Sequence, residues 1–146
     1  MARFVFPLQP VLDARRRKEE EKLRAFARAK AARDENARDL GRLDGALRIG
    51  GRALHEFAMT GSTASLRLYD AHLGYLERTL QSREKSSAES APVLDRAASE
   101  LYAANRERRL LEKLKERRLQ EFEREEARRD ERELDEANAR STMGRL

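Results

Sequence analysis

The sequence predicts an all-α protein built as a long antiparallel two-helix coiled-coil hairpin. Ala, Leu, Glu, Lys and Arg supply 93 of the 146 residues, a bias typical of coiled coils and long helices. Only eight residues are Val, Ile or Thr, so the chain has little material for a β-sheet. Apolar residues recur at heptad spacing on both sides of one clear turn signal, which predicts two helices that fold back on each other.

The first helix is expected over about residues 5–58. Its start is the most apolar and proline-rich stretch of the chain, where Pro7 and Pro10 either hold the backbone extended or sit in the first helical turn. Nine of its fifteen heptad core positions are apolar, and the core is most polar between Arg15 and Lys22. The a positions are Leu12, Glu19, Phe26, Arg33, Leu40, Leu47 and Leu54, and the d positions are Leu8, Arg15, Lys22, Ala29, Asn36, Leu43, Gly50 and Phe57.

A turn is expected near residues 58–63, followed by a second helix over about 63–138. Gly61 suits a helix C-cap, and Ser62 or Thr63 suits the next N-cap. Eleven of the twenty core positions of the second helix are apolar. Its a positions are Leu66, Leu73, Leu80, Ser87, Leu94, Leu101, Arg108, Lys115, Phe122 and Arg129, and its d positions are Tyr69, Leu76, Arg83, Ser90, Ala97, Ala104, Leu111, Arg118, Glu125 and Arg132.

Pro92 interrupts the second helical pattern without changing its register. This favours one helix with a kink near Ser86–Pro92, and a true break there is the alternative. A short turn forces the two helices antiparallel, so that Leu47 is expected opposite Leu73 and Leu12 opposite Leu111.

The same pairing leaves residues 115–146 as a helical overhang, with a frayed tail over 139–146. Nine acidic and four basic residues lie between Leu119 and Glu136, so this part has no core of its own. We expect one coiled-coil domain over residues 1–146.

Catalytic and metal-binding motifs are missing from the sequence. There is no Cys and there are two isolated histidines, and no phosphate-binding or hydrolase motif is present. The carboxylate clusters at 19–21 and 123–126 are interpreted as solvated faces, because a hairpin offers no dry pocket to shift their pKa values. We therefore expect no enzyme activity, no cofactor and no metal.

Charge and hydropathy argue against a nucleic-acid-binding protein and against a membrane-spanning one. The 32 basic residues are interleaved with 27 acidic ones, so the net charge of +5 gives little reason to expect nucleic acid as a partner. No apolar run approaches the roughly 20 residues of a membrane span, and the N-terminus lacks the apolar stretch expected of a signal peptide. A soluble, intracellular protein without direct membrane insertion is expected.

Two local features admit a functional interpretation. Arg15, Arg16, Arg17 and Lys18 are expected to lie beside Arg106, Arg108 and Arg109. Either nearby glutamates, including Glu107, neutralise this basic cluster, or it faces an acidic partner.

The second feature is the set of glycines at 41, 45, 50 and 51 within the first helix. Each costs up to roughly 1 kcal/mol relative to Ala. Either these glycines reflect neutral sequence drift in a helix that tolerates them, or they form a thin strip of helix surface against which another molecule packs.

The opening of the chain resembles the N-terminus of the FliJ family of flagellar export proteins. The pattern Phe-x-Phe-x-Leu-Gln-x-Val-Leu is read from Phe4 to Leu12, with prolines at 7 and 10, and leads into the basic run 15–18 and the glutamates 19–21. The charged stretch Leu110–Leu134 also looks like that family.

The resemblance implies a cytoplasmic component of the flagellar type III export apparatus, associated with the basal body at the inner membrane. It implies a stalk similar to the rotor stalk of rotary ATPases, whose terminal end enters the hexameric export ATPase FliI and whose hairpin end contacts the export gate protein FlhA. Substrate chaperones are implied as further partners. An equivalent stalk of a virulence secretion system and a nucleic-acid-associated hairpin are the alternatives.

Candidate contact residues follow from the resemblance and the basic cluster. The expected ATPase contacts are Arg15, Arg16, Arg17, Lys18, Arg106, Arg108 and Arg109. The expected gate contacts, carried over by position, are Arg38, Arg42, Gly45 and Ile49 on the first helix and His72, Leu76, Thr79 and Arg83 on the second.

Overall fold

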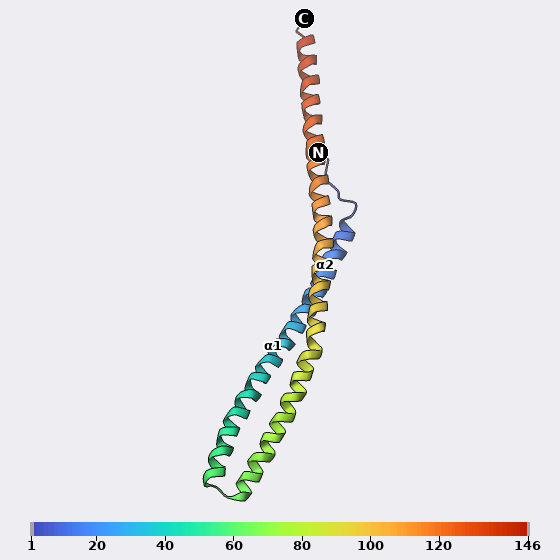
Figure 1. Ribbon diagram of the computed structural model, residues 1–146. Coiled ribbons are helices and arrows are strands. Elements are labelled where there is room, and N and C mark those ends of the chain that lie inside the picture. Colours follow the sequence, from blue (N-terminus) through green and yellow to red (C-terminus); the bar gives the residue numbers. More distant parts are fainter. Residues whose placement is uncertain (1, 146) are drawn as a thin grey trace. The chain divides into compact units, whose positions relative to one another are not determined.

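The computed structural model, which describes residues 2–145, contains two long helices and no strand within that range. Helix α1 spans Gln9–Thr60 and helix α2 spans Thr63–Met143, and the chain reverses direction between them (Figure 1). The predicted all-α helical hairpin is therefore confirmed. Neither helix has a stretch long and apolar enough to cross a lipid bilayer within the described residues.

The two helices contribute to two compact units, which are described separately below. Unit 1 combines the chain up to Glu20 with the part of α2 from Ala103 onward, and unit 2 comprises Glu21–Tyr102. Both units consist of an α1 segment beside an α2 segment. The single domain over residues 1–146 stays a prediction.

Burial follows the predicted heptads closely. Every a and d position from Leu12 to Phe57 is at least partly buried except Arg33. From Leu66 to Phe122 the exceptions are Arg83 and Arg118. The buried hydrophobic side chains among the described residues are few, which shows how thin the core is: they are Phe6, Leu12, Leu76, Leu94 and Ala104.

The turn between the helices consists of Gly61 and Ser62. The Gly61 N–H donates to the Phe57 carbonyl at 2.7 Å and closes α1. The Ser62 hydroxyl accepts from the Ser65 N–H at 3.3 Å, which makes Ser62 the N-cap of α2 as predicted. A Cβ at position 61 would lie 2.7 Å from the Phe57 carbonyl oxygen, so only glycine fits there without rearrangement.

Packing near the turn sets the register. The rings of Phe57 and Tyr69 lie 4.8 Å apart, and Leu73 packs so closely on Gly50 that a Cβ there would be 2.5 Å from its Cδ2. The expected partner of Leu73 was Leu47, so the observed register lies within one turn of the prediction.

Helix α2 continues through Pro92, so the alternative of a true break is wrong. Proline lacks the N–H that would bond to the Ala88 carbonyl four residues back. In the same turn the Ser90 hydroxyl donates to the Ser87 carbonyl at 2.8 Å. The helix also extends to Met143, beyond the expected end near 138. An Arg140–Glu136 ion pair and a Thr142 hydroxyl bonded to the Asn138 carbonyl accompany these last turns.

Helix α1 begins at Gln9, later than the expected start near residue 5. Phe6 precedes Pro7, a position that disfavours helical backbone. Residues 2–6 have no regular structure, 7–8 form a turn, and Pro10 sits in the first turn of α1. The placement of a proline in the first helical turn is confirmed for Pro10, whereas Pro7 lies in a turn that the Gln9 N–H closes on the Phe6 carbonyl at 3.0 Å.

Candidate partner-binding sites

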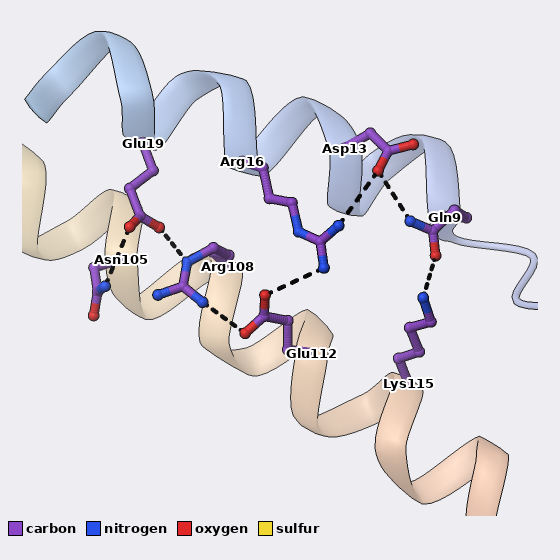
Figure 2. Close-up of polar contacts among 8 residues, drawn as sticks. All are labelled: Gln9, Asp13, Arg16, Glu19, Asn105, Arg108, Glu112 and Lys115. Atoms are coloured by element: carbon purple, nitrogen blue, oxygen red, sulfur yellow. Dashed lines mark hydrogen bonds and ion pairs between the residues drawn. The ribbon is translucent and has the colours of Figure 1, made fainter. Parts of the chain in front are cut away.

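A polar network joins α1 to α2 in unit 1, within the part of the α1 core that the heptads predict to be most polar (Figure 2). Glu19 accepts hydrogen bonds from Arg108 and Asn105, and Arg108 also donates to Glu112 at 2.6 Å. Glu112 in turn accepts from Arg16 at 3.4 Å. The polar core positions of one helix therefore face complementary charges on the other.

The network ends at the first residue of α1. The Gln9 side chain accepts a hydrogen bond from Lys115 at 2.8 Å and donates one to Asp13 at 2.9 Å. Asp13 lies 3.9 Å from Arg16, which links this end to the glutamates described above.

Ion pairs also neutralise the other side of the same segment. Arg15 and Lys18 both reach Glu107, at 2.6 Å and 3.5 Å. The side chains of Arg15 and Glu107 remain about two-fifths exposed, so this pair contributes roughly 0–1 kcal/mol. Of the two interpretations of the basic cluster, neutralisation by glutamate is confirmed for these residues.

Arg108 is the most enclosed member of the basic cluster. It and Glu19 each have a side chain that is 22% exposed. The hydrogen bond to Glu19 raises the pKa of Arg108, against the opposing effect of partial desolvation. Arg108 therefore acts within the hairpin, as the charged partner of Glu19, and presents little of its guanidinium to another molecule.

Three members of the basic cluster remain available to a partner. Arg17, Arg106 and Arg109 are exposed, and no ion pair within residues 2–145 involves them. The structure thus divides the seven predicted ATPase contacts into four paired residues and three outward-facing ones.

An apolar strap, defined as residues 3–8, packs against α2 in the same unit. Phe6 is 6% exposed, and the Phe4 ring lies 5.6 Å from the Phe122 ring at an interplanar angle of 52°. The residues beyond 115 were expected to have no partner, which is wrong as far as Phe122. Heptad periodicity misses this contact because the strap is not helical, although its two phenylalanines are visible in the sequence.

The hairpin end lies in unit 2, where two cross-helix ion pairs show which heptad positions share one side of the hairpin. Lys22 pairs with Glu100 at 3.0 Å and Asp39 with Arg83 at 3.7 Å. These residues occupy heptad positions d and g on both helices. Positions d and g, with the adjacent position c, therefore share one side of the hairpin, which we call the d/g/c side.

Six of the eight predicted gate contacts fall on the d/g/c side. They are Arg42, Ile49, His72, Leu76, Thr79 and Arg83, while Arg38 and Gly45 occupy position f on the outer face of α1. Leu76 is buried in the core, with 9% of its surface exposed, and Arg83 and Arg42 flank Asp39. Ile49 is 72% exposed and His72 is also exposed.

Two exposed apolar side chains on this side were not predicted. Leu68 is 73% exposed and Tyr75 is 60% exposed, and both occupy position c of α2. Their heptad position could have identified them from the sequence, because a large apolar residue outside the a and d positions has no role in the core. Gly45 has no atom within 4 Å of where its Cβ would be, so nothing in the described chain requires a glycine there.

The described residues contain no group of three or more His, Asp or Glu side chains that could hold a metal ion. The candidate sites described above are charged and apolar surfaces of the two helices.

Comparison with known proteins agrees with this geometry. The sequence profile described as "Flagellar FliJ protein" matches residues 4–146. The chain belongs to the FliJ family. FliJ proteins are non-enzymatic, cytoplasmic components of type III export machinery, so this chain is a type III export protein of the stalk class.

The remaining comparisons add little to the FliJ assignment. A solved structure of a protein described as a YscO homolog, CT670, from Chlamydia trachomatis aligns with 94% of this chain and 93% of its own, at 24% identity and a TM-score of 0.44. No curated protein matches the sequence.

Proposed function

We propose that the chain is the stalk of a bacterial flagellar type III export apparatus, coupling the hexameric export ATPase FliI to the export gate protein FlhA. The observation that carries this proposal is the FliJ family match over residues 4–146 of a chain that forms a two-helix hairpin. The mechanism is mechanical and needs no cofactor. In this role the protein acts in the cytoplasm beside the basal body, and escort of substrate chaperones is part of the same proposal.

The ATPase contact is assigned to Arg17, Arg106 and Arg109. Their guanidinium groups are exposed and have no acidic partner within the described chain, so they are the members of the basic cluster that an acidic partner surface would neutralise. Arg15 and Arg108 are already paired with glutamates, and removing them would disturb the hairpin.

Stimulation of purified FliI tests this assignment. We expect the triple variant Arg17→Gln, Arg106→Gln, Arg109→Gln to lose most of its stimulation of ATP hydrolysis at low salt, with unchanged helicity. The matched control replaces Arg24, Arg28 and Arg33, three exposed arginines of α1, by Gln. Equal losses in both triples would reduce the effect to net charge, and full activity of the first triple would refute the assignment.

The gate contact is assigned to the d/g/c side of the hairpin end. Ile49, Leu68 and Tyr75 expose large apolar surfaces there, and His72 and Thr79 lie on the same side. Large apolar side chains flanked by polar ones are typical of protein interfaces. Leu76 supports this side from within the core and is not itself offered to a partner.

Binding to purified FlhA tests the gate assignment. We expect Ile49→Ser combined with Tyr75→Ser to weaken binding at least tenfold without loss of helicity. The control pair Val93→Ser and Tyr102→Ser removes similar side chains that are 57% and 67% exposed on α2, farther from the turn. Normal FlhA binding by the first pair would exclude this side of the hairpin.

A further inference from the structure

The outer face of α2 in unit 1, defined as heptad positions b, c and f over residues 103–138, takes no part in the packing of that unit. The ion pairs to α1 use Glu107, Arg108 and Glu112, at positions g, a and e. The strap packs on Phe122, at position a. Every residue of the outer face is exposed, so the face meets solvent along its whole length in the single chain.

The charge of the outer face changes sign along the helix. The basic half, residues 103–120, has four basic side chains and one acidic one on this face. They are Arg106, Arg109, Lys113, Arg117 and Glu116. The acidic half, residues 121–138, has three acidic side chains and one basic one. They are Glu123, Asp130, Glu131 and Arg124. No ion pair within residues 2–145 involves any of these nine side chains.

Each half also exposes one large apolar side chain. Leu110 in the basic half is 66% exposed, and Leu134 in the acidic half is 63% exposed. They occupy positions c and f, which point away from the a and d core that α2 shares with α1. Only another molecule can therefore remove these two side chains from water.

A second copy of the chain supplies the complement of this face. When two outer faces lie antiparallel, the basic half of each meets the acidic half of the other, whereas a parallel arrangement places like charges together. Centring the antiparallel pairing on Gln120 gives three pairs of opposite charge, which are Arg109 with Glu131, Arg117 with Glu123, and Glu116 with Arg124. Even the one exceptional charge of each half therefore meets its opposite.

Helical spacing keeps the whole face in contact in this arrangement. From Arg106 to Leu134 the c and f positions follow each other at alternating intervals of four and three residues, the repeat that holds two helices along one seam. The same register brings Leu110 of each copy within one turn of Leu134 of the other. Charge and apolar surface thus agree on one pairing.

We propose that the outer face of α2 is a self-association surface, through which two copies of the chain form an antiparallel dimer about a two-fold axis near Gln120. The contact uses the same face of both copies, so it closes at two. It consists mainly of exposed charges and is therefore weak and sensitive to salt. The proposal does not rest on the proposed function, because the partner is the chain itself. The dimer covers Arg106 and Arg109, so a chain within it cannot also offer them to the ATPase.

Charge reversal tests the dimer, with sedimentation equilibrium of the full chain as the measurement. We expect wild type to dimerise with rising concentration at about 0.1 M salt and to be monomeric at about 1 M, because the Debye length falls from roughly 10 Å to roughly 3 Å. The acidic variant combines Arg109→Glu with Arg117→Glu, and the basic variant combines Glu123→Arg with Glu131→Arg. Each should dimerise at least tenfold more weakly at low salt, since both halves then carry charge of the same sign.

Two matched controls separate complementarity from net charge. An equimolar mixture of the acidic and basic variants should form heterodimers about as tightly as wild type forms its dimer, because each half of one variant meets an opposite charge on the other. The quadruple variant with all four reversals keeps the net charge of wild type and exchanges the signs of the two halves. It should dimerise as wild type does.

Three outcomes would overturn the dimer. The first is a wild-type chain that stays monomeric at low salt up to its solubility limit. The second is dimerisation that the acidic and basic variants retain, because the contact would then lie elsewhere. The third is failure of the mixture or of the quadruple variant to dimerise while circular dichroism shows wild-type helicity, because opposite charge on the two halves would then not be what joins the copies.

Discussion

Three glycines of α1 lie in helical backbone with no neighbour that requires a missing side chain. No heavy atom lies within 4 Å of where a Cβ would be at Gly41, Gly45 or Gly51. None of the glycines in the described chain has a positive φ. Each Gly→Ala change therefore removes backbone entropy from the unfolded chain without a clash, which is worth roughly 0.5–1 kcal/mol.

The triple variant Gly41→Ala, Gly45→Ala, Gly51→Ala should raise the free energy of unfolding by roughly 1.5–3 kcal/mol if the three effects add. At roughly 2–4 °C per kcal/mol for a chain near this size, the expected increase in Tm is roughly 3–12 °C. Circular dichroism at 222 nm, followed through thermal and urea unfolding, measures both quantities.

Gly50 provides the internal control. A Cβ there would lie 2.5 Å from the Leu73 Cδ2, so Leu73 has to move and the gain in helix propensity is offset. We expect Gly50→Ala to leave stability unchanged or to lower it. Equal stabilisation by Gly50→Ala and by Gly51→Ala would refute the packing around Leu73, and a triple variant no more stable than wild type would refute the open surroundings of the other three.

Three further predictions concern the turn, acid stability and the polar core. Gly61→Ala should destabilise the hairpin in a urea titration because its Cβ would meet the Phe57 carbonyl. Ser62→Ala should lower the free energy of unfolding by roughly 0.5–2 kcal/mol because the N-cap of α2 is lost. A neutral result for both variants would contradict the turn geometry. The hydrogen bond from Lys22 lowers the pKa of Glu100 in the folded state. As the pH falls, the unfolded chain therefore takes up the proton first. The stability that this pair contributes is present above the unfolded pKa of about 4.3 and is lost as the pH drops through the lower folded value. As the pH is lowered below about 5, Tm should therefore fall less steeply in Glu100→Gln than in wild type. In a double-mutant cycle at Glu19 and Arg108, Arg108→Leu alone should be more destabilising than the Glu19→Leu, Arg108→Leu pair, and additive effects would show that the two side chains are not coupled.

The helical core could be predicted because it depends on periodicity alone. Between Leu12 and Phe122, nearly all heptad positions chosen from the sequence are at least partly buried, including charged residues such as Arg15 and Lys22. What periodicity cannot give is the partner of each charged side chain. Arg15 reaches Glu107 and Arg108 reaches Glu19 because of a register that the sequence fixes only to within about one turn. The basic run was expected beside Arg106, Arg108 and Arg109, and its members pair instead with the interleaved Glu107 and Glu112.

The candidate sites were only partly predictable for a related reason. Leu76 was expected to serve both the core and a partner, yet burial assigns it to the core. Tyr75, its neighbour in sequence, points away from the core and offers the exposed ring that an interface would use. A difference of one residue rotates a helical side chain by about 100°, so assigning contacts by position alone can choose the wrong face of the same turn.

The strap contains the Phe-x-Phe segment that distinguishes this chain from other charged coiled coils. Charged coiled coils resemble one another easily because many sequences satisfy a heptad, whereas an extended Phe-x-Phe segment has no such repeat to explain it. Phe4 and Phe6 are two residues apart, so an extended backbone directs both rings to the same side, where Phe6 is buried and Phe4 meets Phe122, and leaves Val5 in solvent. Helical backbone would place these rings about 200° apart and could not bury both against one helix. The prolines that delay the start of α1 until Gln9 are therefore part of how the chain covers the end of its own core.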